Sequence, residues 1–210
     1  EIFRSSIHYC DLMTSISKFS LKDTVDFYKP EFDKRNIPTR VIYHGTDKLY
    51  DPAKNPGFKL PFDNYFVVFG NFYKHKFVPQ LLEALKSSKH RIIVIGSTSE
   101  GAIGSNMYGY KSGNLSDEFI DYVLGNSLGI IFPSIYEGFG LPFLDGMSYS
   151  KKIIVNNTEL NRELKNYFDA FSENVYIFNS LDEVDGILDK VEADPVIHYK
   201  NNDSHIRSWE

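Results

Sequence analysis

The chain has 210 residues, of which 42% are hydrophobic and 24% charged, a composition typical of a globular protein and unlike that of a disordered or fibrous chain. Its formal net charge of −5 excludes an overall basic surface for nucleic acid, although a local basic patch is compatible with it. The single cysteine, Cys10, excludes an intrachain disulfide and any metal site built from several cysteines. No apolar run approaches the ~18 residues of a transmembrane helix.

The first residues predict a short α/β segment. Residues 12–17 have the pattern of a strand, and residues 18–28 have the pattern of a helix. The stretch 29–38 contains two prolines and alternating charges, which predicts a linker. Residues from about 196 onward show no clear pattern. Because the chain begins at Glu1 and not at methionine, we expect it to be a fragment of a longer protein.

Short runs rich in Val, Ile, Phe or Tyr then recur at regular intervals, and each predicts a strand. They cover residues 40–43, 65–69, 91–95, 128–132, 152–155 and 174–178. Amphipathic helix patterns separate several of them, at residues 78–85, 117–124 and 181–191. Continuous apolar runs suit strands buried on both faces, so the sequence predicts a doubly wound α/β domain with a parallel sheet. Ligands bind such sheets at the carboxyl ends of the strands.

The loop after the 128–132 strand carries the strongest site signal. Gly138 and Gly140 flank Phe139 and permit a tight turn and close backbone approach to a ligand. Pro142 suits the first turn of a helix. A strand, a glycine turn and a helix N-terminus present free N–H groups to an anion, for which phosphate is the obvious candidate.

Two carboxylates, Glu137 and Asp145, lie eight positions apart around this helix start. Both are expected to reach the crevice at the strand ends, where they would accept hydrogen bonds from sugar or ribose hydroxyls. The alternative is that they are solvated acids that favour the positive end of the helix dipole.

The segment after the 65–69 strand is basic. Gly70 ends the strand, and Lys74, His75 and Lys76 precede the next helix. A cation at a helix N-terminus is unfavourable by roughly 0.3–1 kcal/mol unless an anion binds there, which favours a phosphate site over a solvated lysine-rich turn. A third segment, residues 108–112, would offer exposed backbone and a tyrosine to a flat ring. The glycines of residues 96–104 predict a flexible loop without a Walker motif.

These segments resemble a known family. Residues 133–142, followed by Asp145-Gly-Met147, look like the donor-site motif of retaining family 4 glycosyltransferases of the GT-B fold. Residues 70–84 resemble the phosphate segment of that family, residues 41–47 the turn that opens its second domain, and residues 17–20 the last strand-to-helix step of its first domain. The resemblance runs from about Cys10 to about Leu188.

The resemblance implies a division of the chain. Residues 1–30 would be the tail of the N-terminal acceptor domain and the hinge, and residues 31–195 the Rossmann-like domain that binds the nucleotide sugar. Residues 196–210 would lead to a missing closing helix. The chain would then be the C-terminal, donor-binding half of a GT-B enzyme and would be inactive alone.

The resemblance also assigns roles to residues. Glu137 would position the donor sugar, Lys76 with His75 would neutralise the leaving diphosphate, and Asp145 would bind ribose hydroxyls. Further donor contacts are expected mainly from backbone at Gly70, Asn71, Tyr110, Lys111, Gly138, Phe139, Gly140 and Leu141. Three positions depart from the family pattern: an aspartate replaces the second glutamate at Asp145, and His75 and Asn71 stand where arginine, or at position 71 also threonine, is usual.

The implied activity is transfer of a sugar from a nucleoside-diphosphate sugar to a glycan or polyprenyl-linked acceptor, with retention of configuration. The resemblance places such enzymes in surface polysaccharide synthesis, in the cytoplasm or peripherally at the inner face of a membrane. No Asp-x-Asp motif occurs, so we expect no metal and no other cofactor. Two alternatives remain: a glycosidase, which also uses paired carboxylates, and a nucleotide-sugar binding module without chemistry, which the three departures favour.

Overall fold

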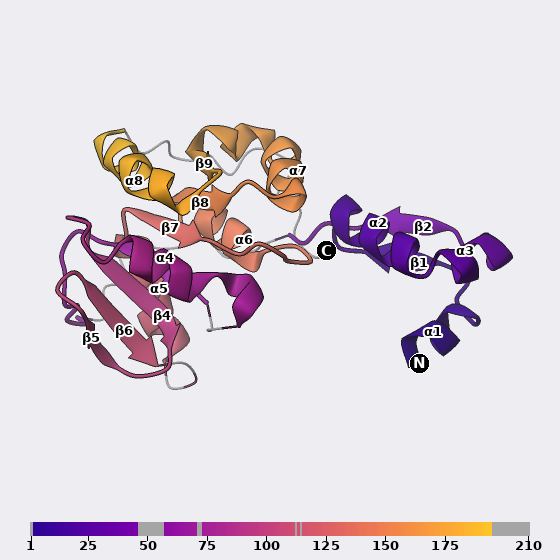
Figure 1. Cartoon of the computed structure of the whole chain (residues 1–210), viewed down its shortest axis with the longest axis horizontal. Coiled ribbons are helices and arrows are strands. Elements are labelled where there is room, and N and C mark those ends of the chain that lie inside the picture. The colour runs from indigo at the N-terminus through magenta and orange to yellow at the C-terminus, as the bar shows by residue number, and fades with distance from the viewer. Residues whose placement is uncertain (1, 46–56, 71–72, 112, 114, 195–210) are drawn as a thin grey trace.

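The computed structural model describes residues 2–45, 57–70, 73–111, 113 and 115–194. It consists of a small N-terminal unit and a larger α/β body, which lie at opposite ends of the view in Figure 1. The small unit contains α1 (Ile2–Ile7), β1 (Met13–Ser15), α2 (Lys18–Phe27), α3 (Lys29–Arg35) and β2 (Thr39–Val41). Its two strands pair in parallel, with Met13 opposite Thr39. The strand and helix predicted between residues 12 and 28 are therefore confirmed.

One prediction for this region is wrong. The expected linker is occupied by α3, because Pro30 lies in its first turn, where proline is favourable, and Phe32 packs with Ile7 and Ile37 in a small core. The strand expected at residues 40–43 is present as β2, and it pairs with β1 and not with the larger sheet. The domain boundary near residue 30 stays a prediction.

The larger body is built on a seven-stranded sheet in the order β5-β6-β4-β3-β7-β8-β9. The central strands are β4 (Ile92–Ser97), β3 (Phe66–Phe69), β7 (Gly129–Phe132) and β8 (Lys152–Asn156), and β9 (Val175–Phe178) forms one edge. These strands and β6 (Met107–Lys111) pair in parallel, whereas β5 (Gly101–Ile103) runs antiparallel to β6. The predicted α/β fold with a parallel sheet is confirmed.

Helices cover both faces of this sheet. Buried residues of α4 (Val78–Ala84) and α8 (Val184–Ala193) form one core with the strands, and α5 (Asp117–Asn126), α6 (Leu141–Ser148) and α7 (Glu159–Tyr167) pack on the opposite face. Short 3₁₀ turns occupy Lys74–Lys76, Asp169–Asn174 and Leu181–Glu183. The predicted cap of α5 is confirmed, since the Ser116 hydroxyl accepts a hydrogen bond from the Phe119 N–H at 3.2 Å.

The hairpin of β5 and β6 replaces the predicted glycine loop. Gly104 has φ of +71° at its turn, a conformation that glycine adopts without strain. Gly109 lies within β6, and a Cβ at that position would come 2.6 Å from the Ser97 hydroxyl of β4. The glycines therefore permit close strand packing here, a common reason for glycine inside a strand.

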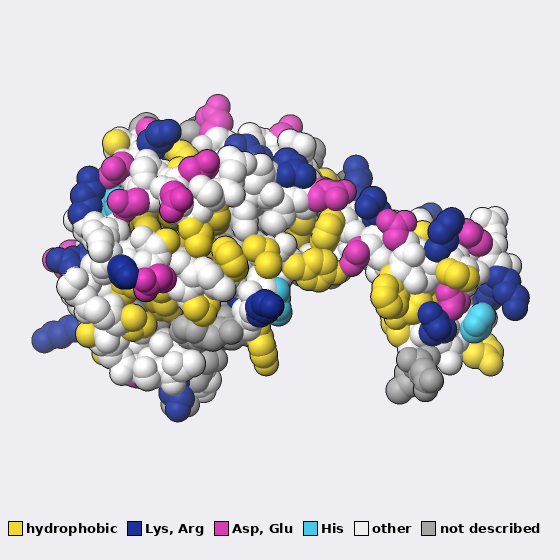
Figure 2. Space-filling view, in the orientation of Figure 1, with side chains coloured by type: hydrophobic (Ala, Val, Ile, Leu, Met, Phe, Trp, Pro, Cys, Tyr) yellow, Lys and Arg dark blue, Asp and Glu magenta, His cyan; other side chains and the backbone are white. Residues whose placement is uncertain are grey.

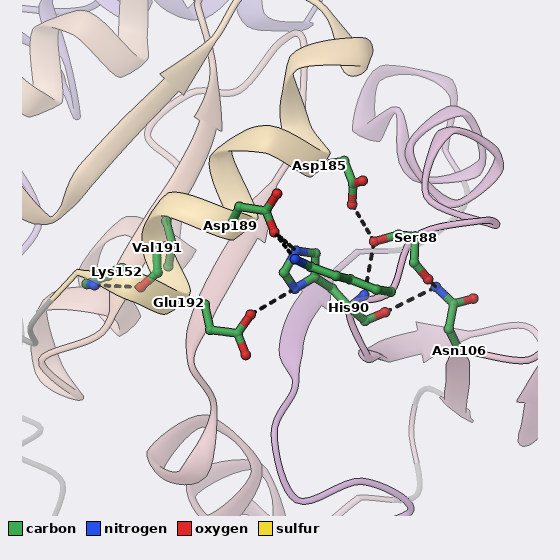
Figure 3. A network of polar contacts seen from close by, with 9 residues as sticks. Ser88, His90, Asn106, Lys152, Asp185, Asp189, Val191 and Glu192 are labelled. Atoms are coloured by element: carbon green, nitrogen blue, oxygen red, sulfur yellow. Dashed lines mark hydrogen bonds and ion pairs between the residues drawn. The ribbon is translucent and has the colours of Figure 1, made fainter.

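A polar network fixes α8 against the amino ends of the central strands (Figure 3). His90 is buried, with its Nε2 3.1 Å from Asp189 and its Nδ1 3.5 Å from Glu192. In the same C-terminal part of the helix, the buried Lys152 donates to the carbonyl of Val191 at 2.6 Å. A cation at a helix C-terminus can bind the last carbonyl groups, which have no partner within the helix, and it interacts favourably with the negative end of the helix dipole. These contacts lie at the amino ends of the strands, whereas the predicted site lies at their carboxyl ends.

Lys151, in the turn between α6 and β8, provides a test of stability against pH. Burial lowers the pKa of Lys151 from its ordinary value of 10.5 to about 8. Between these two pKa values the unfolded chain binds more protons than the folded chain, so stability rises with pH. The unfavourable contribution of Lys151 to the free energy of unfolding is therefore greatest below pH 8 and disappears as pH approaches 10.5. Lys151→Met should therefore raise the free energy of unfolding at pH 7 by about 1–2 kcal/mol, with a smaller gain at pH 10.

Urea denaturation at the two pH values measures this difference. Lys86→Met is the matched control, because the Lys86 side chain is 64% exposed and its replacement should leave stability nearly unchanged. An equal gain from Lys151→Met at both pH values would show that packing, and not the buried charge, is responsible.

Candidate functional site

The site predicted from the sequence lies where β3 and β7 end. These neighbouring strands are parallel, with Phe66 opposite Gly129, so their carboxyl ends meet at one edge of the sheet. The segments that follow them, residues 73–77 and 133–140, lie against each other, and the Ile135 N–H donates to the His75 carbonyl at 2.9 Å. The fold thus brings together two of the three segments that the sequence singled out.

Lys76 and Glu137 form an ion pair at this edge. Lys76 Nζ lies 2.5 Å from Glu137 Oε1, and the two side chains are only 21% and 18% exposed. The ammonium group also lies 5.6 Å from the centre of the Phe132 ring. Partial burial reduces solvent screening. The two charges therefore interact more strongly with each other, and with any charged group that enters the site, than they would in water.

Local backbone geometry directs Lys76 inward. Gly70 leaves β3 with φ of +153°, and a Cβ there would come 2.8 Å from Val78 Cγ2, so only glycine fits. Lys74, His75 and Lys76 form one 3₁₀ turn, and Phe77 then adopts a left-handed conformation before α4 begins. Lys74 and His75 are exposed on this turn, and only Lys76 of the basic cluster reaches the glutamate.

The two glycines after Glu137 have different reasons for being small. Gly140 has φ of +86° at the start of α6, and a Cβ there would lie 3.0 Å from the Phe132 ring, so it makes the turn as expected. Gly138 has no such backbone conformation. A Cβ at Gly138 would instead lie 3.3 Å from Ile16 Cδ1, in the N-terminal unit. The packing of that unit against the loop therefore requires a small residue at this position.

The turn before α6 presents backbone donors. The Phe143 N–H bonds to the Gly140 carbonyl at 2.9 Å. Within the described parts of the chain, the N–H groups of residues 138–141 make no hydrogen bond. Unpaired N–H groups at a helix N-terminus favour an anion. They lie beside the Lys76–Glu137 pair, so the edge combines a cation, a carboxylate and free donors.

The other residues predicted for the site differ in how accessible they are to a ligand. Asp145 lies in the second turn of α6 and is partly buried. The side chain of Phe139 is buried against Phe132 and Phe143, so only its backbone is available to a ligand, whereas Leu141 is exposed. The exposed His75 ring stacks on Tyr73, with the ring centroids 6.0 Å apart. Asn71 lies outside the described residues.

The third segment is a strand and not a loop. Tyr110 belongs to β6, is buried, and packs edge-on against Phe119 at 4.8 Å. Burial raises the pKa of the Tyr110 hydroxyl, with a smaller contribution from Tyr108. Lys111 is the exposed last residue of β6. Because β6 runs parallel to β4, this end reaches the same edge as the other two segments, but the tyrosine ring is enclosed by protein.

Five hydrogen bonds near the site were not predicted from the sequence. The hydroxyls of Ser17 and Ser20 both donate to the Gly138 carbonyl at 2.7 Å. The Glu163 carboxylate, from α7, accepts the N–H groups at the start of α2 and the Tyr43 hydroxyl at 2.7 Å. The serines stood in a recognised segment, but nothing in the sequence connected them to a loop about 120 positions away, and Glu163 had no motif around it.

Similarity to solved structures shows which fold the chain has. Sucrose-phosphate synthase from Thermosynechococcus elongatus superposes with a TM-score of 0.66 at 15% identity, over 92% of this chain and 52% of that chain. WaaG, a glycosyltransferase involved in lipopolysaccharide biosynthesis, gives 0.55 at 12% identity, over 86% and 53% of the two chains. The pneumococcal O-GlcNAc transferase GtfA, solved with UDP and GlcNAc, gives 0.58 at 13% identity, over 89% and 38%. The chain thus has the fold of GT-B glycosyltransferases and spans about half or less of their length.

The chain belongs to the glycosyl transferases group 1 family, whose model matches residues 54–201. This range includes both segments of the candidate site. A search of curated proteins found no match.

The described residues contain no group of three or more His, Cys, Asp or Glu side chains placed to hold a metal ion, and the expected metal independence stays a prediction. No helix among them has the length and apolar character needed to cross a membrane.

Proposed function

We propose that this chain is the donor-binding part of a retaining glycosyltransferase. The enzyme would move a sugar from a nucleoside-diphosphate sugar to a glycan or polyprenyl-linked acceptor, in surface polysaccharide synthesis at the cytoplasmic face of a membrane. The observation that carries the proposal is the partly buried Lys76–Glu137 pair beside the free N–H groups at the start of α6. The membership in a glycosyltransferase family supports sugar transfer, and the family resemblance supports the finer assignments.

The Lys76–Glu137 pair suits a nucleotide sugar, because the cation can contact its diphosphate and the carboxylate can contact its sugar. When the bond between the anomeric carbon and the diphosphate oxygen breaks, the electron pair leaves with the diphosphate, and negative charge grows on it. Lys76 and the N–H groups of residues 138–141 would stabilise that charge, the type of contact that accelerates a reaction most. Glu137 would accept hydrogen bonds from sugar hydroxyls and keep the sugar aligned. Asp145 would bind the ribose hydroxyls, and the base would lie near the end of β6.

The N-terminal unit supports the idea that the acceptor is held elsewhere in a larger protein. A two-stranded sheet is marginal on its own, and Figure 2 shows apolar side chains on the flank of this unit that faces the larger body. The exposed large apolar residues of the unit are Phe3, Tyr9, Leu12, Ile16, Phe27 and Ile42. Further protein that covers them would complete an acceptor domain, and residues 196–210 would lead to the helix that closes the two domains.

One observation favours a second function, a nucleotide-sugar binding module without chemistry. Lys76 is already paired with Glu137, and the exposed His75 ring stacks on Tyr73, so Lys76 would be the single cation that the described basic turn brings to the diphosphate. Binding requires less charge stabilisation than departure of the diphosphate does.

Binding of UDP, GDP and ADP, and of their sugar derivatives, tests the proposed function. Calorimetry on the 210-residue chain should show micromolar to millimolar affinity for one nucleoside diphosphate and its sugar derivative without added metal. Binding of oligosaccharides in the absence of any nucleotide binding would contradict the proposal and favour a glycosidase. Transfer by the longer protein, but not by this chain alone, would distinguish the enzyme from the binding module.

A further inference from the structure

Two serine hydroxyls of the N-terminal unit converge on one carbonyl of the site loop. Ser17 Oγ and Ser20 Oγ each donate to the Gly138 carbonyl oxygen at 2.7 Å, and Ser17 is fully buried. A carbonyl oxygen has two lone pairs, and both are used here by side chains from the same helix start. The direction of the peptide group after Gly138 is therefore set by α2.

The start of α2 is itself held firmly. The Ser17 hydroxyl accepts the Ser20 N–H at 2.9 Å, as an N-cap residue does. The two oxygens of Glu163 accept the N–H groups of Lys18 at 2.7 Å and Phe19 at 2.8 Å. A carboxylate at a helix N-terminus makes charge-assisted hydrogen bonds and is favoured by the dipole. Glu163 thus anchors α2 to α7 of the larger body.

The held carbonyl adjoins the residue that matters most in the proposed site. Gly138 directly follows Glu137, whose carboxylate is paired with Lys76. Gly138 also contacts Ile16 closely enough that a Cβ would lie 3.3 Å from its side chain. On the outer side of the loop, the Tyr136 hydroxyl donates to Asp23 of α2 at 2.5 Å. The residues on both sides of Glu137 therefore contact the N-terminal unit, Gly138 through its backbone and Tyr136 through its side chain.

We propose that Ser17 and Ser20 are positioning residues for the donor sugar, acting through the Gly138 carbonyl on Glu137. This inference rests on the proposed function, and it assigns the N-terminal unit a role in the donor site, separate from any part it has in holding the acceptor. Of the proposed diphosphate contacts, only the Phe139 N–H belongs to the peptide group that the hydroxyls hold, whereas Lys76 and the other N–H groups lie outside it. Loss of a hydroxyl should therefore affect the sugar more than the nucleotide.

Ser20→Ala is the cleanest variant, because Ser20 donates to Gly138 without capping a helix. In the 210-residue chain, affinity for the nucleoside diphosphate should stay within about twofold, whereas the additional affinity conferred by the sugar should fall about three- to tenfold, the effect of one hydrogen bond. Ser20→Thr, which keeps the hydroxyl, should restore it. Ser17→Ala removes both a hydrogen bond to Gly138 and the N-cap of α2. Its control is Ser116→Ala, which removes the equivalent cap of α5 and no contact with the loop.

Amide hydrogen exchange gives a readout that needs no ligand. The N–H groups of Ile135 and Phe143 are hydrogen-bonded on either side of the loop, and their exchange should accelerate in Ser20→Ala and Ser17→Ala but not in Ser116→Ala. Unchanged exchange, or an equal loss of affinity for the nucleotide with and without its sugar, would overturn the inference. If no nucleotide binds to the unmodified chain, the proposed function fails, whereas the exchange result still decides whether the serines hold the loop.

Discussion

Replacing Lys76 with methionine should lower the affinity for a nucleoside diphosphate by roughly 10- to 150-fold, because a hydrogen bond to a charged group contributes about 1.5–3 kcal/mol. Methionine keeps most of the side-chain volume beside Phe132 and removes the charge. It also leaves the partly buried Glu137 without its cation, which opposes a diphosphate further. Calorimetric titration with the nucleotide selected by the binding panel measures the loss.

Lys74→Met is the matched control for this variant. Lys74 belongs to the same 3₁₀ turn but is exposed, so its replacement should change affinity by no more than about twofold. Thermal unfolding of both variants establishes that they remain folded. Equal losses in the two variants would indicate a diffuse electrostatic effect and would contradict a specific phosphate contact of Lys76.

Replacing Glu137 with glutamine should have the opposite effect on nucleotide binding. The amide keeps the shape of the carboxylate but no longer competes with phosphate for Lys76, so affinity for the nucleoside diphosphate should rise by a few-fold. Turnover by the longer protein should nevertheless fall by about 100-fold or more, because a preorganised charged contact to the reacting sugar is lost. Titration gives the first quantity, and initial rates at saturating donor give the second.

The control for this second variant addresses the simplest alternative, that Glu137 is a solvated acid near a helix start. Glu118 is such a residue, exposed in the first turn of α5. Glu118→Gln should leave both affinity and turnover unchanged. If Glu137→Gln behaves in the same way, Glu137 has no part in the reaction and the binding-module alternative gains support.

The sequence predicted the sheet well because each central strand is a short apolar run. The strands around residues 66–69 and 92–97 are buried on both faces, and no other structure suits such runs of that length. The hairpin of β5 and β6 was missed because its glycines have the pattern of a loop. Only the close approach of Gly109 to Ser97 in the folded sheet shows why a glycine is needed inside the strand.

The part of the site that depends on local backbone structure could be predicted from the sequence. Gly140 and Pro142 act locally, through backbone conformation and helix initiation, and local requirements are visible in a sequence. The small size of Gly138 reflects a contact with Ile16, and Glu163 acts on a helix 144 to 145 positions away. Such requirements arise from tertiary structure, which no motif in a single sequence records.

The pairing of Lys76 with Glu137 also has a consequence for folding. The two residues are 61 positions apart, and the intervening chain contributes β4, β5, β6 and α5 before it returns to form β7 beside β3. Closing so long a loop costs entropy before any contact within the site can form. The site therefore exists only in chains whose central strands have already paired. If the proposed donor binds there, it should stabilise the completed sheet by mass action, and abundant nucleotide sugar should then protect the protein from unfolding.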